Sequence, residues 1–209
     1  MKSKALWWAA GIMAASAIAV GCAGALAQDP PPTAAAPVHF NGVINDYPVS
    51  TTSSGGTIGP WEVRGPWSLN LQGFSGTASF SAALTMELDD LSVGGGATAD
   101  ARNQHTHHIT MTGATVSENF PQGDCPSATG FPTYSSHLEV TGMADVTGNG
   151  GSPFGSGVLV PLKVCIGGGS KLQFSNIQLV FTKNSDGTPS PATLHFGAQP
   201  LHGVVSTTN

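Results

Sequence analysis

Residues 79–88 read SFSAALTMEL, and apolar side chains occupy every second position of this segment. Phe80 and Leu84 fall on one face of an extended strand, whereas Ser79 and Glu87 fall on the other face. Alternation with a period of two is typical of a strand that packs one face on a core and exposes the other to water. The segment therefore predicts a half-buried β-strand.

The same alternation recurs in residues 67–71, 138–146 and 158–166, and glycine-rich stretches such as residues 148–151 separate the runs as predicted turns. Beyond the N-terminal segment no window of about twelve residues repeats every 3.6 residues, so helix is expected only in that segment. The sequence predicts an all-β fold, an antiparallel β-barrel or β-sandwich of about seven to nine strands. An outer-membrane barrel is the structural alternative, and the Ser, Thr, Glu and Lys residues on the outward faces argue against it.

The N-terminal segment has the organisation of a secretory signal peptide. Lys2 and Lys4 precede an uncharged apolar run, and the small-residue tripeptide Ala-Leu-Ala ends residues 1–27. Residues 28–37 are then a Pro/Ala-rich linker, and residues 38–209 are expected to form a single β domain. The chain is therefore expected to be exported to the periplasm or the extracellular space.

Two alternatives to a cleaved signal peptide remain open. The tetrapeptide Ala19-Val20-Gly21-Cys22 resembles the lipobox of bacterial lipoproteins, in which the cysteine is acylated and anchors the protein. The apolar run is also long enough for an uncleaved membrane anchor. Cleavage after Ala27 would leave no membrane span in the mature chain.

The charge balance restricts the partners. Only 9% of residues are charged, and loss of Lys2 and Lys4 leaves five Lys and Arg against twelve Asp and Glu, a net charge of about −7. Because no basic stripe is present to neutralise phosphates, the sequence argues against nucleic acid as a partner. A small molecule or a metal ion is the partner expected, and the sequence makes no prediction of the oligomeric state.

Two cysteines remain after cleavage at residue 27, namely Cys125 and Cys165. In an oxidising compartment they are expected to form a disulfide, which in the chain-entropy model stabilises the fold by about 4 kcal/mol. Cys165 shares the polar face of its predicted strand with Lys163, so the bridge is expected on the outside of the sheet. Two free thiols are the alternative.

Three of the seven histidines stand within four residues, at His105, His107 and His108. In a strand over residues 103–116, His105 and His107 share the apolar face with Ile109, whereas His108 takes the other face. Two imidazoles on one face can bind a single metal ion when a third ligand comes from a neighbouring segment. Carbonic anhydrases and cupins use such pairs, although the similarity ends at these two residues and identifies no family.

The predicted metal site consists of His105, His107 and His202, with zinc or copper as the expected ion. His195 is the disfavoured candidate, because in an extended segment its two neighbours Leu194 and Phe196 would take the core face and turn the imidazole outward. Hydrogen-bonded rim residues without a metal are the structural alternative for the pair.

Arg102 is assigned with His105 and His107 to a ligand-binding site, because an arginine at a pocket mouth can hold a carboxylate. The first hypothesis for function is an exported module that binds a small ligand or a metal at this pocket. The second is a small metal-dependent or histidine-based enzyme that uses the same site, although the sequence identifies no catalytic residue. The third is a structural surface protein without a site.

Export predicts a mature N-terminus at Gln28. Mass spectrometry of the intact protein purified from an expressing bacterium should give the mass of residues 28–209. A mass that corresponds to a lipid-modified Cys22 would establish the lipoprotein alternative instead.

Overall fold

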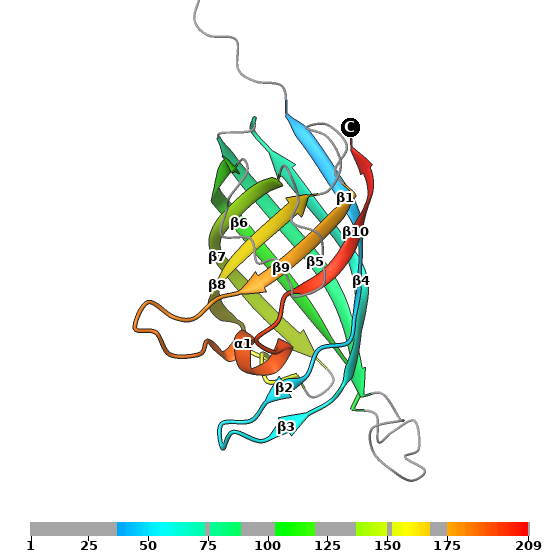
Figure 1. Cartoon of the computed structure of the whole chain (residues 1–209), viewed down its shortest axis with the longest axis vertical. Helices are drawn as coiled ribbons and strands as arrows, with labels where there is room; N and C mark the ends of the chain where they lie inside the picture. The colour runs from blue at the N-terminus through cyan, green and yellow to red at the C-terminus, as the bar shows by residue number, and fades with distance from the viewer. Residues whose placement is uncertain are drawn as a thin grey trace, which may run out of the picture. The chain divides into compact units, whose positions relative to one another are not determined.

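The computed structural model of the chain describes residues 37–73, 76–88, 103–119, 137–149, 152–167 and 175–208. Within these ranges eight strands close into an antiparallel β-barrel in the order β1-β10-β9-β8-β7-β6-β5-β4, and β4 pairs back with β1 (Figure 1). The strands are β1 (Val38–Asp46), β4 (Trp61–Leu71), β5 (Thr77–Leu88), β6 (His105–Asn119), β7 (His137–Asn149), β8 (Val158–Gly167), β9 (Asn176–Phe181) and β10 (Leu201–Thr208). The predicted all-β antiparallel fold is confirmed, and it is a barrel.

Residues 1–36 lie outside the described ranges, so the signal peptide, the linker and the lipobox stay predictions. No helix within the described ranges has the length and apolar character needed to cross a membrane.

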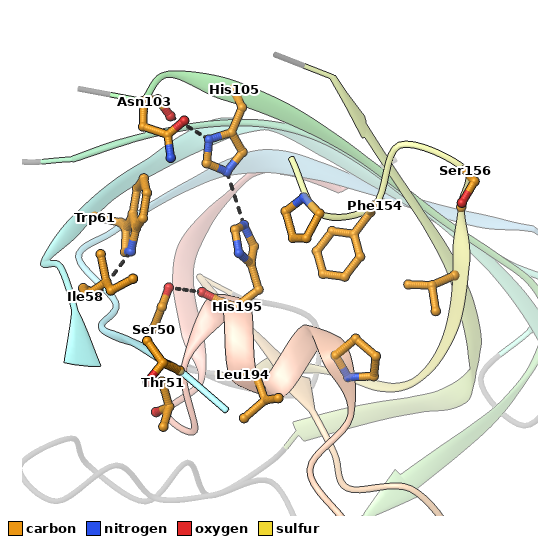
Figure 2. A pocket seen from close by; sticks show the side chains of 15 residues that line it. Ser50, Thr51, Ile58, Trp61, Asn103, His105, Phe154, Ser156, Leu194 and His195 are labelled. Atoms are coloured by element: carbon orange, nitrogen blue, oxygen red, sulfur yellow. Dashed lines mark hydrogen bonds between the residues drawn. The ribbon is translucent and has the colours of Figure 1, made fainter. Parts of the chain in front are cut away.

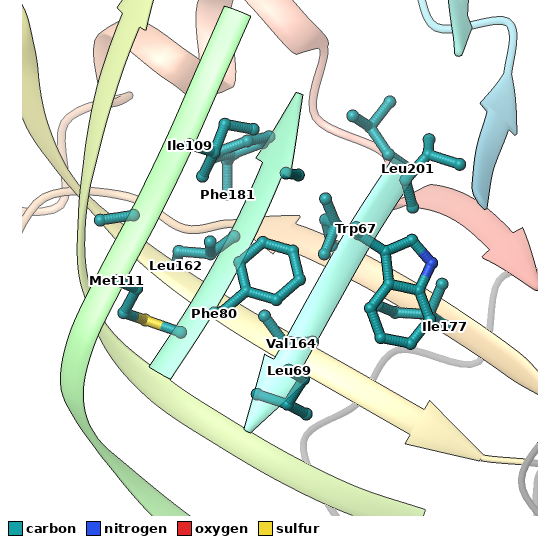
Figure 3. Close-up of a cluster of buried hydrophobic side chains, with 14 of the residues drawn as sticks. Trp67, Leu69, Phe80, Ile109, Met111, Leu162, Val164, Ile177, Phe181 and Leu201 are labelled. Carbon is teal, nitrogen blue, oxygen red and sulfur yellow. The ribbon is translucent and has the colours of Figure 1, made fainter. Parts of the chain in front are cut away.

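The alternation of side chains along each strand fills the barrel interior. Trp67, Leu69, Phe80, Ile109 and Leu162 come from four strands, and each is at most 3% exposed (Figure 3). An eight-stranded barrel is just wide enough for its inward side chains to fill it, so these residues form a continuous core. Each such burial contributes about 1.5–3 kcal/mol relative to an exposed side chain.

On β4 and β5 the intervening positions face outward and are mostly polar. Ser68 on β4 and Ser81 on β5 lie opposite each other, with their hydroxyl oxygens 2.8 Å apart. Arg64 forms an ion pair with Glu62 on its own strand at 2.8 Å and another with Glu87 across to β5 at 3.3 Å. The pattern of residues 79–88 thus predicts correctly which side of β5 is buried.

Strand β6 changes phase in its second half. Gly113 has φ = 65°, and the pairing of β6 with β7 shifts between Met111 and Thr115, so both Met111 and Ala114 are buried. A β-bulge of this kind adds an unpaired residue and bends the strand. Because the bulge follows Met111, the histidines at the beginning of β6 keep the original alternation.

Two insertions lie at one end of the barrel. The hairpin of β2 (Ser50–Thr51) and β3 (Thr57–Ile58) precedes β4, and the helix α1 (Pro191–Phe196) precedes β10. Figure 1 shows both elements at the same end, and α1 contacts β2. This end of the barrel is also where β6 begins.

The expectation that helix would be confined to the N-terminal segment is wrong for α1. Ser190 caps this helix by accepting a hydrogen bond from the Thr193 amide at 3.1 Å, and Pro191 occupies the first turn. Gly197 ends it with φ = 87°, a conformation that favours glycine. A helix of six residues is too short to produce a repeat in a window of twelve.

Substitutions at two adjacent residues of β5 test which face of this strand is buried. Phe80→Ala should lower the free energy of unfolding by about 3–5 kcal/mol, because the truncation leaves a cavity in the core. Ser81→Ala removes only an exposed hydroxyl contact and should cost less than about 1 kcal/mol. Urea unfolding measures both values, and similar losses for the two variants would contradict the burial described here.

Candidate metal site

The two strand histidines lie inside the barrel at the end that carries α1. His105 and His107 occupy the first two inward positions of β6 and are 2% and 0% exposed. His108, the next residue after His107, is exposed on the outside. The alternation of the strand therefore places both imidazoles on the same side, as the sequence indicates. Across the sheet His107 lies opposite Leu84 on β5 and Gly148 on β7.

The third histidine of the cluster is His195 on α1. Its Nε2 lies 3.1 Å from His105 Nε2 and 3.0 Å from His107 Nε2 (Figure 2 shows the first of these contacts). One nitrogen from each of the three side chains lies within 4.8 Å of the other two. The structure thus brings three imidazoles to one point from two elements about ninety residues apart in the chain.

The structure does not bring His202, the predicted third ligand, into this cluster. His202 follows the inward Leu201 on β10, and its Nδ1 lies 2.8 Å from the Asp46 carboxylate. Residues 193–196, which the sequence analysis treats as extended, belong to the helix α1. In α1, Phe196 enters the core, and the helical turn directs His195 toward the strand histidines.

Other predicted site residues lie outside the described ranges. Arg102 and Cys125 are among them, so the ligand-binding role of Arg102 and the Cys125–Cys165 disulfide stay predictions. Cys165 lies on β8 and is 4% exposed. It was expected on the polar face, and its position opposite Glu139 and Gln178 agrees with that face, although the face is buried at this point.

The outer nitrogens of the two strand imidazoles contact groups that orient the rings. His105 Nδ1 donates to the backbone carbonyl of Asn103 at 2.6 Å, so its Nε2 presents a lone pair to the cluster. His107 Nδ1 lies 3.2 Å from Ser152 Oγ, which also accepts a hydrogen bond from the Phe154 amide at 3.1 Å. Partners of this kind fix the tautomer and ring direction of metal-binding histidines.

A glycine makes room for the serine contact. A Cβ atom on Gly148 would lie 2.1 Å from Ser152 Oγ, so a larger residue at position 148 would displace this side chain from His107. The loop that follows β7 returns toward the barrel through a hydrogen bond from the Gly148 amide to the Phe154 carbonyl at 3.1 Å. Ser152 therefore reaches His107 because position 148 has no side chain.

Aromatic rings surround the imidazoles. Trp61 packs edge-on against His105 at 5.4 Å between ring centroids, and Phe154 packs edge-on against His195 at 5.2 Å. Phe196 contacts His107 at 4.8 Å and stacks on Phe181 of β9 at 4.7 Å. The imidazoles are therefore packed among aromatic side chains.

Burial keeps two of the imidazoles neutral. It lowers the pKa of His107 to about 3, with further lowering by the nearby His195 and His105. It also lowers the pKa of His195 to about 4, and His105 adds to that effect. A neutral imidazole has a lone pair for a metal ion, so at neutral pH both side chains are in the form that binds metal.

The spacing of the nitrogens suits a tetrahedral metal ion. With metal–nitrogen distances of about 2.1 Å, two ligand nitrogens of a tetrahedral ion lie about 3.4 Å apart. The two contacts of His195 Nε2, at 3.1 Å and 3.0 Å, are only slightly shorter than that. The third pair of nitrogens lies within 4.8 Å, so the side chains would rotate to admit an ion.

A pocket of about 580 Å³ opens beside the cluster. His105 and His195 form part of its wall, together with the apolar side chains of Ile58, Trp61 and Leu194 (Figure 2). His107 lies behind them and does not line the pocket. An ion held by the three imidazoles would therefore lie at the edge of this pocket.

Sequence reasoning missed His195 and the aromatic rings that surround the cluster. The signal for His195 was present, because Ser190-Pro191 and Gly197 are the start and stop residues of a short helix. Trp61 and Phe154 carry no comparable signal, since their approach to the histidines depends on pairing between distant strands and on a loop conformation.

Comparisons of the chain with protein-family models, with curated proteins and with solved structures found no match. The function of the site is therefore argued from its geometry.

The lowered pKa values predict a stability that depends on pH. Between pH 6.5 and about 4 the unfolded chain binds protons at positions 107 and 195 and the folded protein does not. The free energy of unfolding should have its full value above pH 6.5. As the pH falls below 6.5, it should decrease by up to about 1.4 kcal/mol per pH unit for each histidine. Urea unfolding of the chelator-treated protein at several pH values measures this slope.

The matched variants for this slope are His107→Gln with His195→Gln, and His108→Gln as the exposed control. The double variant should show a shallower slope than the wild type, and His108→Gln should retain the wild-type slope. Equal slopes for all three proteins would show that the buried imidazoles do not carry the effect.

Proposed function

We propose that the protein binds one divalent transition-metal ion, with Zn²⁺ as the preferred ion, through His105, His107 and His195, and presents the open coordination position to a small molecule in the adjacent pocket. The observation that carries this proposal is the convergence of three imidazole nitrogens, with His195 Nε2 at 3.1 Å and 3.0 Å from the other two. Three protein ligands with one open position form the arrangement that exchangeable zinc sites use.

The donor set supports zinc or copper over the hard cations. Imidazole nitrogen binds Zn²⁺ and Cu²⁺ well, whereas Ca²⁺ and Mg²⁺ require oxygen ligands. The cluster contains three histidines and no carboxylate among the residues that the structure describes. The hydrogen bond of His105 to the Asn103 carbonyl supports the same proposal, because it directs the Nε2 lone pair to the ion.

Hydrogen bonding alone does not account for the cluster. His105 Nε2 offers a lone pair, so its contact needs a proton on His195 Nε2. That nitrogen then has no lone pair for His107, and a single proton faces two partners at 3.1 Å and 3.0 Å. A metal ion would accept lone pairs from all three nitrogens, which favours a metal site over a purely structural role.

A small metal-dependent enzyme is the second candidate, and the open position beside the pocket favours it. A water molecule bound to zinc ionises near neutral pH and can attack an ester or a carbonyl. Hydrolysis of an activated ester by the zinc-loaded protein, faster than by free zinc and lost in His195→Gln, would favour the enzyme. A rate equal to that of free zinc would leave the binding module.

Metal titration tests the proposed site. The chelator-treated protein should bind about one Zn²⁺ per chain in isothermal titration calorimetry, and a hundredfold excess of the ion over Kd should raise the free energy of unfolding by about 2.7 kcal/mol. Either His195→Ala or the pair His105→Ala with His107→Ala should weaken binding by at least about 100-fold.

The controls are two histidines outside the cluster. His108→Ala and His202→Ala should bind Zn²⁺ as the wild type does, because His108 is exposed and His202 contacts Asp46. A wild-type protein that binds no ion under these conditions would contradict the proposal. Equal loss in the two controls would place the ion elsewhere.

A further inference from the structure

The pocket beside the proposed metal site has an apolar wall and an imidazole base. Ile58 and Trp61 lie on one side of His105 and His195, and Phe154 lies on the opposite side (Figure 2). Leu194 lines the pocket next to His195. A volume of about 580 Å³ falls in the range of pockets that take small organic molecules. The wall therefore suits a ligand with an aromatic or aliphatic body.

The charge of the metal site determines which polar group the ligand should carry. Among the described residues that line the pocket none is Asp, Glu, Lys or Arg, and the three metal ligands are imidazoles. A divalent ion there would keep its full charge of +2 beside a wall of apolar and uncharged polar side chains, where an uncompensated charge is costly. An anionic group at the open coordination position would offset that charge.

We propose, resting on the metal site of the preceding section, that the pocket binds a small organic anion. Its carboxylate, or a similar anionic head, coordinates the metal between His105 and His195, and its aromatic or aliphatic body packs between Trp61, Phe154 and Leu194. Specificity then needs both parts of the ligand. A short anion lacks the body, and a neutral or cationic molecule of the same shape lacks the head.

Cobalt makes the head group observable. The Co²⁺-loaded protein is titrated with phenylacetate, octanoate, acetate, 2-phenylethanol and 2-phenylethylamine, and the visible absorption of the cobalt ion reports coordination. Phenylacetate or octanoate should change the spectrum at concentrations at least about tenfold below those that acetate requires, because their bodies bury apolar surface. The alcohol and the amine should leave the spectrum unchanged.

Variants of the wall test the two parts separately. Leu194→Ala should weaken the binding of phenylacetate by about threefold to tenfold and leave the binding of acetate unchanged. The substitution removes apolar contact with the ligand and leaves the imidazoles in place. Ile58→Glu should weaken both anions relative to Ile58→Gln, which has the same shape without the charge. Leu159→Ala is the control, because this side chain is 66% exposed on β8 and does not line the pocket.

The outcomes separate this inference from the metal proposal. If the protein binds Co²⁺ and phenylacetate binds no more tightly than acetate, the inference is overturned and the metal site stands. Calorimetry that shows equal phenylacetate binding with and without the ion would also overturn it. If no Co²⁺ binds at the histidines, both proposals fail together.

Discussion

The constraint on which the structure depends is the period of two in a closed barrel. Once the eight strands close, every second side chain of each strand has no other place than the interior. Most of these positions are apolar and form the core, but the first two on β6 are His105 and His107. The alternation that buries the apolar side chains thus also buries the imidazoles of His105 and His107.

The end of the barrel is where such groups are tolerated. His105 and His107 lie beside α1 and the loop before β8, which supply His195 and Ser152 as polar contacts for the ring nitrogens. Deeper positions on β6, such as Ile109 and Met111, belong to the buried hydrophobic core (Figure 3). The polar layer and the apolar core therefore meet along a single strand, and the boundary falls between His107 and Ile109.

Part of this arrangement follows from the sequence, and part depends on contacts that no local pattern contains. The alternation of residues 79–88 and the His-x-His spacing are local, so the buried face of β5 and the common direction of His105 and His107 could be predicted. Closure into a barrel depends on pairing between β1 and β10, at opposite ends of the domain. The choice of His195 over His202 depended on six residues of helix, where one wrong assumption about the backbone reversed the direction of a side chain.

The three histidines of the cluster come from parts of the chain that are far apart in sequence. His105 and His107 belong to a strand in the middle of the domain, whereas His195 arrives with the helix just before the last strand. In an unfolded chain nothing holds His195 beside His105 and His107, so the set of three forms only on folding. An ion bound at the proposed site would therefore stabilise the folded barrel over the unfolded chain.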